Sequence, residues 1–498
     1  MELLDNLALG LATAASWQNL LFCLAGVMIG TLVGVLPGIS PLTTVAMLLP
    51  FTFGLPPASA MIMLAGIFYG AQYGSSTAAI LVNVPGETSS IVTCIDGYQM
   101  ARQGRAGSAL AIAAIASFLA GTVATLAIAL MSLPLAALAL KFTAVETVSL
   151  VILGLLGAVV LAHGSPTKAI AMIIVGVLVG LVGVDVNSGA PRMTFGIPDI
   201  TDGISFVPIA IGLFGIAEMI RNLEQPQDRQ LAGVRIANLL PTRAEMIAAF
   251  PAMLRGTAVG CLLGVLPGGG AALPPFSAYA LEKKIAADPS RFGKGAIEGV
   301  ASPEAANNAG AQTSFVPMLT LGLPTNPLMA LMIGALMIQG IQPGPQVMTK
   351  QPDLFWGVIA SMWIGNLMLV IINLPLIGIW VSLLRVPYAL LFPAIVVFCG
   401  IGAYSINSSL FDVWLMLGFG ALGYFFLKVG VEPAPFVLGF VLGPMLEENF
   451  RRAMLIASGD LMVFIARPIS AFLLACSAAL LAALLFPEIR RRREALQD

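Results

Sequence analysis

Two polar segments interrupt an otherwise apolar chain, and each contains residue types that bind small ions. Residues 74–90 read GSSTAAILVNVPGETSS, and residues 307–327 read NNAGAQTSFVPMLTLGLPTNP. Each holds an apolar run that is too short to cross a bilayer and is followed by a turn containing proline. The pattern predicts half-helices or re-entrant hairpins, whose free N–H groups attract a carboxylate and whose free carbonyl oxygens suit a sodium ion. The expected ligand is therefore a small anion.

Small polar and turn residues of these segments form the predicted substrate-binding site. They are Ser75, Ser76, Thr77, Asn83, Pro85, Gly86, Thr88, Asn308, Thr313, Ser314, Pro324, Thr325 and Asn326. Small polar residues also cap helices or join neighbouring helices in membranes. For each single residue, that interpretation is as good as ligand binding.

Acidic residues within or beside hydrophobic segments indicate ion binding, because burying a charge in a membrane costs free energy. Glu87, Glu304 and Asn307 are the candidates for binding a coupling ion, which is sodium or a proton. Glu304 can alternatively hydrogen-bond the backbone. For Glu218 we favour a helix-end ion pair with Arg221, three residues later.

Catalytic and metal-binding chemistry is not expected from this sequence. The chain has one histidine, His163, which we interpret as structural, and 5 cysteines without a CxxC or Cys/His spacing. Zinc sites, disulfide frameworks and cofactors are therefore not expected. The segment YGSST does not have the strand-turn-helix setting of a hydrolase nucleophile. A net charge of −1 offers no basic face for nucleic acid. The predicted function is not enzymatic.

The composition places the polar segments in a membrane. Hydrophobic residues make up 58% and charged residues 10% of the 498 residues, against roughly 45–50% and about 25% in soluble domains. Residues 107–131 and 467–487 are long enough to cross about 30 Å of hydrocarbon as helices. The N-terminus lacks the basic region of a cleavable signal peptide, so residues 17–36 are predicted to be a permanent first span.

Several short motifs occur twice in the same order, which indicates a duplicated unit. GVLPGISP at 34–41 is matched by GVLPGGG at 264–270, GAQ at 70–72 by GAQ at 310–312, and LPL at 133 by LPL at 374. Pro37 with Gly38, and Pro267 with Gly268, are predicted to break their helices, because each pair removes a backbone hydrogen bond and permits a turn. An isolated copy of the motif would more readily mark the aqueous end of an ordinary helix.

Basic residues gather in loops that we expect to be cytoplasmic. These are residues 221–243, residues 281–299 and the tail around 490–493. Their counterparts in the other half carry few or no bases, which predicts inverted halves, a periplasmic N-terminus and a cytoplasmic C-terminus. Arg451 and Arg452 are the exception, and Glu447 and Glu448 are expected to offset their charge.

The predicted fold is an all-α polytopic membrane protein with about 12 transmembrane helices, in two inverted-topology repeats with broken helices or re-entrant hairpins. We predict a first repeat at 1–222, a cytoplasmic linker at 223–243, a second repeat at 244–452, and a C-terminal helix with a basic cytoplasmic tail at 453–498. The Pro-Gly breaks are expected to let the tips at 85–88 and 324–327 meet at the centre.

The motifs also resemble those of a known family. GVLPGISP, YGAQYGSSTAAILVNVPGE, DGYQMARQGRAGSAL, GVLPGGG and ASPEAANNAGAQTSFVPMLTLGLPTNPLMALMIGAL are similar to the large membrane subunit of the tripartite tricarboxylate transporter family (TctA-type), over nearly the whole chain. The resemblance implies a Gram-negative inner-membrane permease driven by an ion gradient. It also implies two partners, a small membrane subunit and a periplasmic solute-binding protein. It does not fix which carboxylate is carried.

We therefore expect a permease subunit that imports a small tricarboxylate or dicarboxylate with sodium ions or protons. The alternative is an anion channel or passive pore, which needs neither a gradient nor a partner protein. The lack of Lys or Arg rings in the apolar segments counts against that alternative. A membrane scaffold would explain the hydrophobicity but not the duplicated breaks.

Overall fold

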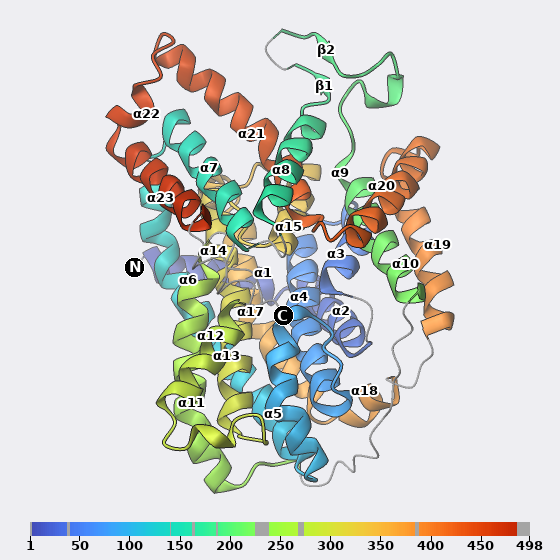
Figure 1. Cartoon of the computed structure of the whole chain (residues 1–498), viewed down its shortest axis with the longest axis vertical. Coiled ribbons are helices and arrows are strands. Elements are labelled where there is room, and N and C mark those ends of the chain that lie inside the picture. The colour runs from blue at the N-terminus through green and yellow to red at the C-terminus, as the bar shows by residue number, and fades with distance from the viewer. Residues whose placement is uncertain are drawn as a thin grey trace.

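The computed structural model describes residues 2–36, 40–139, 141–161, 165–185, 188–224, 239–266, 273–383 and 388–485. The predicted breaks at Pro37-Gly38 and Pro267-Gly268 lie outside the described residues, as do His163, most of the predicted linker and the basic tail. Figure 1 shows the described chain as an assembly of helices that is longest in the vertical direction.

The first part of the chain is helical apart from one small hairpin. Its elements are α1 (Glu2–Ala14), α2 (Trp17–Val35), α3 (Pro41–Thr52), α4 (Pro57–Val82), η1 (Thr88–Ser90), α5 (Ile91–Arg102), α6 (Ala106–Ala139), α7 (Ala144–Leu161), α8 (Pro166–Gly180), β1 (Gly183–Val184), β2 (Pro191–Arg192), η2 (Pro198–Ile200), α9 (Phe206–Ala210), the π-helical turn η3 (Ile211–Ile216) and α10 (Ala217–Glu224). Strands β1 and β2 pair in the antiparallel sense and project from the top of the molecule in Figure 1. The short helix α1 is an element that the sequence analysis does not predict.

The second part of the chain is helical in all its described elements. These are α11 (Arg243–Gly264), α12 (Leu273–Ile285), η4 (Pro289–Arg291), α13 (Glu298–Thr313), α14 (Phe315–Leu321), α15 (Pro327–Ile338), α16 (Pro345–Lys350), α17 (Pro352–Asn373), α18 (Ile377–Leu383), α19 (Tyr388–Asn407), α20 (Leu410–Lys428), α21 (Ala434–Ile456), α22 (Val463–Ala466) and α23 (Pro468–Leu485).

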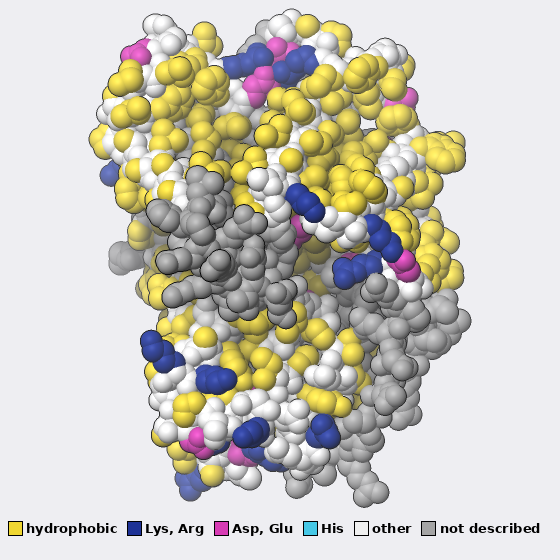
Figure 2. Space-filling model, viewed as in Figure 1, with side chains coloured by type: hydrophobic (Ala, Val, Ile, Leu, Met, Phe, Trp, Pro, Cys, Tyr) yellow, Lys and Arg dark blue, Asp and Glu magenta, His cyan; other side chains and the backbone are white. Residues whose placement is uncertain are grey.

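Six of the described helical segments are long and apolar enough to cross a membrane. They are Trp17–Val35, Ala106–Leu135, Phe206–Glu224, Arg243–Gly264, Pro352–Asn373 and Leu410–Lys428. Further apolar helices of 10–17 residues accompany them. Figure 2 shows hydrophobic side chains over much of the upper part of the visible face, with a group of Lys and Arg at its lower end. The chain is thus an all-α membrane protein, as its composition predicts.

Glycines at helical spacing allow α2 and α4 to touch along their backbones. Gly26, Gly30 and Gly34 are four residues apart, so they share one face of α2. A Cβ atom added at these positions would collide, in that order, with the carbonyl oxygens of Met63, Ile67 and Ala71 on α4. Only glycine permits this close approach. The hydrophobic effect does not drive helices together inside a membrane, so such close packing is a source of helix association there.

The same arrangement joins α11 to α13. Gly256, Gly260 and Gly264 share one face of α11, and a Cβ at each would collide with the carbonyl oxygen of Ser302, Ala306 or Gly310 on α13. The two central helices that result are almost wholly enclosed: residues 59–81 of α4 and 299–313 of α13 are all buried. Helices α6 and α17 flank this pair, with α6 against α13 and α17 against α4.

Both predicted turns are present, but the first does not follow a short half-helix. Residues 74–82 are the C-terminal part of the 26-residue helix α4, which ends at Asn83 in the left-handed conformation (φ 56°). The expectation of a short half-helix is wrong here, because residues 57–82 form one continuous helix in which the Ser76 and Thr77 hydroxyls contact carbonyl oxygens of the preceding turn. The second run does divide, into α13 and the seven-residue α14, which ends at Gly322 with φ 70°.

Candidate functional site

Polar side chains of α4, α5, α6 and α13 meet in the buried centre of the molecule. Ser76 donates a hydrogen bond from Oγ to Oε2 of Glu304 at 2.7 Å, and Gln72 donates from Nε2 to Oδ1 of Asn307 at 3.2 Å. Helical spacing of three or four residues puts each set on one face of its helix. We define the central polar cluster as Gln72, Tyr73, Ser76, Thr93, Ser117, Glu304, Asn307 and Asn308, all of which are buried.

Glu304 is the acid at the middle of this cluster. Its side chain is fully buried, and its two carboxyl oxygens accept hydrogen bonds from the hydroxyls of Ser76 on α4 and Thr93 on α5. Among the described residues, no Lys or Arg forms an ion pair with it. The expected alternative, a hydrogen bond to the backbone, is not what the carboxylate makes. A buried carboxyl without a basic partner suits a proton or a small cation.

Amide side chains continue the polar face of α13 toward α6. Asn308 donates from Nδ2 to the Ser117 hydroxyl at 2.7 Å and to the Glu304 carbonyl oxygen at 3.1 Å. One turn later, Thr125 of α6 donates to Oε1 of Gln312 at 2.8 Å. These contacts fix the position of α13 relative to α6 along the length of the cluster.

Several buried polar atoms in and beside the cluster have no hydrogen-bond partner within the described ranges. They are the acceptors Gln72 Oε1 and Asn308 Oδ1, the donors Asn307 Nδ2 and Gln312 Nε2, and the Tyr73 hydroxyl. Buried polar groups are nearly always satisfied by protein, water or a ligand. Donors and acceptors are therefore both available to a polar guest at this depth.

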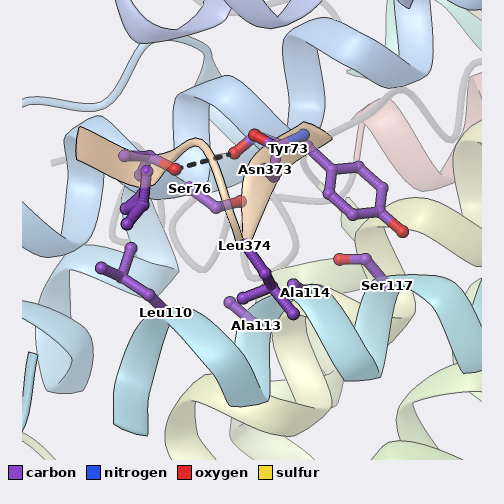
Figure 3. A pocket seen from close by; sticks show the side chains of 10 residues that line it. Tyr73, Ser76, Leu110, Ala113, Ala114, Ser117, Asn373 and Leu374 are labelled. Atoms are coloured by element: carbon purple, nitrogen blue, oxygen red, sulfur yellow. Dashed lines mark hydrogen bonds between the residues drawn. The ribbon is translucent and has the colours of Figure 1, made fainter. Parts of the chain in front are cut away.

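A small pocket lies beside the central polar cluster (Figure 3). It is lined by Tyr73, Ser76 and Thr77 of α4, Leu110, Ala113, Ala114 and Ser117 of α6, and Asn373, Leu374 and Ile377 at the end of α17 and start of α18. Its enclosed space has room for about one water molecule. A substrate larger than water can enter only if these helices move.

The first turn, residues 83–87, adjoins the cluster. The Ser75 hydroxyl accepts a hydrogen bond from the Glu87 backbone N–H at 3.0 Å and lies 2.6 Å from the Ser90 hydroxyl, so it holds the turn. The Glu87 carboxylate accepts from Ser89 at 2.5 Å, and it is close enough to the Glu304 carboxyl for their charges to repel. A Cβ on Gly86 would lie 2.6 Å from the Gly34 carbonyl oxygen, so this turn also packs against the end of α2.

The second turn, residues 323–326, is buried. Asn326 caps α15 through Oδ1, which accepts from the Met329 N–H at 2.9 Å. The buried Thr325 hydroxyl has no hydrogen-bond partner among the residues that the structure describes. A Cβ on Gly322 would lie 2.8 Å from the Pro343 carbonyl oxygen, so the loop before α16 covers this turn. Nothing tests the expectation that the two turns meet, and it stays a prediction.

The predicted site residues thus separate into groups. Ser76, Glu304, Asn307 and Asn308 belong to the central polar cluster, with Thr77 in its pocket and Glu87 beside it. Ser75, Pro85 and Gly86 build the first turn, where Asn83 and Thr88 are exposed. Thr313 and Ser314 bond back to carbonyls of α13. Pro324, Thr325 and Asn326 form the second turn, where Asn326 has the capping role that the sequence left open.

Sequence reasoning missed several members of the cluster. Gln72 and Gln312 each end one copy of the duplicated GAQ motif. This repetition is the signal that could have marked them as candidate site residues. Tyr73 follows Gln72 directly, and Thr93 lies one helix later. Ser117 and Thr125 are two of the five hydroxyl residues in the long apolar helix α6, and only the packing of α6 on α13 reveals their partners.

The expected pairing of Glu218 is wrong. In the described part of the chain Glu218 forms no ion pair with Arg221; its carboxyl group instead lies in hydrogen-bond contact with the hydroxyls of Ser40 and Thr43 at the start of α3. The physical reason is the close packing of α3 on η3, which brings uncharged donors nearer than the arginine.

The expected pairing of the two exceptional arginines is confirmed. Arg451 binds Glu447 at 2.6 Å, and Arg452 binds Glu448 at 2.5 Å. Glu447 also accepts from Arg192 of β2 at 2.7 Å, which raises the pKa of that guanidinium. The hairpin is thereby tied to the end of α21.

Three comparisons relate the chain to known proteins. A family model described as "Tripartite tricarboxylate transporter TctA family" matches residues 20–438. A protein of Agrobacterium vitis named "Uncharacterized 52.8 kDa protein in TAR-I ttuC' 3'region" is 57% identical over 494 residues, which cover 99% of this chain and 98% of that protein. A second, "Uncharacterized protein in TAR-II ttuC' 3'region" from the same organism, is 60% identical over 235 residues, 47% of this chain and 97% of its own length. No solved structure matches the chain.

Proposed function

Because the chain belongs to the tripartite tricarboxylate transporter TctA family, we propose that it is the large permease subunit of a secondary transporter that imports a small tricarboxylate or dicarboxylate. The family is one of transporters rather than enzymes. The proposed setting is the inner membrane of a Gram-negative bacterium, with the N-terminus in the periplasm and the C-terminus in the cytoplasm. The proposed partners are a small membrane subunit and a periplasmic solute-binding protein that delivers the carboxylate.

Two inverted repeats of about 12 spans in total are proposed as the transport architecture. The order of elements supports this: α2, α3, α4, α5 and α6 have counterparts of the same order in α11, α12, α13 with α14, α15 and α17. The close glycine contacts support it more sharply. Gly26, Gly30 and Gly34 each precede Gly256, Gly260 and Gly264 by 230 residues, and each set makes the same contact with the second helix that follows.

The central polar cluster is the proposed site of the coupling ion. Glu304 and Glu87 repel one another when both are charged and have no basic partner among the described residues. A sodium ion or a proton between them would remove that repulsion. The side-chain oxygens of Gln72 and Asn308 have no hydrogen-bond partner among the described residues and can also coordinate a cation.

The second turn is the proposed site of the substrate carboxylate. It precedes the 12-residue helix α15, whose N-terminal N–H groups and positive dipole end favour an anion. The Thr325 hydroxyl is buried there without a partner in the described residues and can donate to a carboxylate. The first turn suits an anion less well, because Glu87 stands at the equivalent place. A cation bound with the anion would offset one negative charge of the carboxylate for each cation that is co-transported.

The difference in burial between the turns supports alternating access. Asn83 and Thr88 are exposed at the first turn, while residues 322–326 are all buried at the second. A single conformation that opens one turn and closes the other is what a transporter requires and what an open pore lacks.

Uptake of a labelled carboxylate panel into proteoliposomes tests the proposal. The chain is reconstituted with its small subunit, with and without the binding protein, under an imposed sodium or proton gradient. We expect uptake that needs the binding protein and one of the gradients. Uptake that proceeds down the substrate gradient alone, without counterflow, would establish the anion channel or passive pore instead.

Two substitutions test the site. Ser76→Leu removes a donor to Glu304 and fills the small pocket, and Asn326→Leu removes the cap of α15. Both variants should insert normally and lose uptake. Thr349→Leu is the control, because Thr349 is exposed on α16, outside both turns and the central polar cluster, and it should retain uptake. Full transport by both site variants would refute the assignment.

A further inference from the structure

A second acid, Glu218, is partly buried away from the central polar cluster, where the start of α3 packs on η3 and contacts α10. Ser40, the N-cap of α3, donates from Oγ to Oε2 of Glu218 at 2.8 Å. The Thr43 hydroxyl contacts the same carboxyl oxygen and lies 2.8 Å from the Phe214 carbonyl oxygen of η3. Helices α3, α10, α19 and α20 lie together on the right of Figure 1. This group of oxygens is the Glu218 site: Ser40 Oγ, Thr43 Oγ1, Phe214 O and Glu218 Oε2.

The hydrogen atoms available at the Glu218 site are too few for an ionised carboxylate. Thr43 has one hydroxyl hydrogen, yet its oxygen is in hydrogen-bond contact with two acceptors, the Phe214 carbonyl and Glu218. If Thr43 donates to Phe214, two lone-pair oxygens face each other at the Glu218 contact. A hydrogen on Glu218 removes the conflict at the Glu218–Thr43 contact, because Glu218 then donates to Thr43, Thr43 donates to Phe214, and Ser40 donates to Glu218. The Ser40–Thr43 contact is then the one of the four contacts that has no hydrogen of its own.

The spacing of the oxygens favours a proton over a sodium ion. The Ser40 and Thr43 hydroxyl oxygens are 2.9 Å apart, and the contacts to Glu218 and Phe214 that have ordinary lengths are 2.8 Å. These are distances of O–H···O hydrogen bonds. A metal ion among the same oxygens would have to push them apart to lie between them.

The backbone beside the Glu218 site contains a π-helical turn, a feature that is common at functional sites. Residues 211–216 form a π-helical turn, which shifts the phase of the helix and aims the Phe214 carbonyl at Thr43. Such turns are rare and occur frequently at functional sites. Helix α3 also starts here, directly after the region where the sequence predicts a broken helix.

Among the described residues, none of the charged or titratable groups around the Glu218 site forms an ion pair with Glu218. Arg221 on the same helix acts only at a distance. Helix α3 has no titratable side chain, and α19 presents Cys399 and Tyr404. On α20, Tyr424 and Lys428 bind Glu224, and Asp412 accepts from Asn407.

From this geometry we propose that Glu218 is a second proton-binding site, separate from the central polar cluster, and that it couples a proton to the position of α3. Loss of the proton leaves Glu218 and Phe214 competing for the one hydrogen of Thr43, which weakens the contact between α3 and α10. Gain of the proton restores it. The coupling role rests on the proposed transport function, whereas the proton site itself does not.

Infrared difference spectroscopy of the purified, reconstituted chain tests the proton site directly. A protonated carboxylic acid has a C=O stretching band that an ionised carboxylate lacks and that shifts in D2O. We expect one such band to be absent from Glu218→Gln and to move in Thr43→Val, which removes one partner of the acid. Glu448→Gln is the matched control: it lies 230 residues later with the same spacing to an arginine, and its carboxylate is exposed and bound to Arg452 at 2.5 Å. That variant should leave the band unchanged.

Three results would overturn the proposal. A spectrum of Glu218→Gln identical to that of the wild type would show that Glu218 holds no proton. Loss of the wild-type band on adding sodium at constant pH would make the site one for sodium. A band that disappears in Glu218→Gln while uptake keeps its full dependence on the proton gradient would remove the coupling role. If instead the wild type transports no carboxylate at all, the proposed function fails while the band still reports on the site.

Discussion

Replacing Asp96 with alanine is expected to detach the loop before α13 from α5 and to destabilise the protein. Asp96 is fully buried on α5. Its Oδ1 accepts hydrogen bonds from the backbone N–H groups of Gly293 at 2.9 Å, Gly295 at 2.7 Å and Ala296 at 2.8 Å, and its Oδ2 accepts from the Tyr279 hydroxyl at 2.9 Å. One carboxylate thus holds a loop that is about two hundred residues away in the chain.

The expected change in the free energy of unfolding depends on which hydrogen-bond donors each substitution leaves without a partner. A hydrogen bond to a charged group contributes about 1.5–3 kcal/mol, and a buried donor left without a partner costs about 1–3 kcal/mol. Water can replace the carboxylate at Gly293, whose contact is only partly buried, but less readily at Gly295 and Ala296. We therefore expect Asp96→Ala to lower the free energy of unfolding by about 3–5 kcal/mol. Asp96→Asn keeps an acceptor oxygen and should cost about half as much, because neutral hydrogen bonds are about half as strong.

Thermal unfolding of the purified chain in detergent, with hydrogen exchange of residues 289–297, measures both effects. The order of stability should be wild type, then Asp96→Asn, then Asp96→Ala, and exchange in the loop should accelerate in that order. Lys294→Ala is the control in the same loop, because the Lys294 side chain is exposed, and it should change little. If Asp96→Ala is as stable as Asp96→Asn, the backbone contacts do not hold the loop and the reasoning fails.

Two further predictions concern helix packing and capping. Gly30→Val should sharply lower the yield of folded protein, because the new side chain collides with the Ile67 carbonyl. Gly418→Ala on α20, where a Cβ meets nothing within 4 Å, should leave the yield unchanged. Size-exclusion chromatography measures the yield of folded protein for both variants. Asn326→Ala should lower stability by about 1 kcal/mol through loss of the α15 cap. A thermal midpoint for Asn326→Ala equal to that of the wild type would contradict this reading of the turn.

The membrane class and the places of the turns followed from the sequence, since both depend on local properties. Runs of apolar residues long enough to cross hydrocarbon can take few structures other than a helix. Helix α4 ends at Asn83, two residues before Pro85, and α14 ends at Gly322, two residues before Pro324, because Asn83 and Gly322 adopt positive φ and a following proline cannot donate a helical hydrogen bond.

The partners of the buried polar residues were decided by tertiary structure alone. Ser76 and Glu304 are separated by 228 residues, and Ser40 and Glu218 by 178. Their contacts depend on how closely α4 approaches α13 and α3 approaches α10, which no single segment determines. Glu218 makes the point most clearly, since its sequence neighbour Arg221 offered a reasonable ion pair. The packing of α3 on η3 replaced that pair with two hydroxyls, because a hydrogen bond forms with the donor that packing brings nearest.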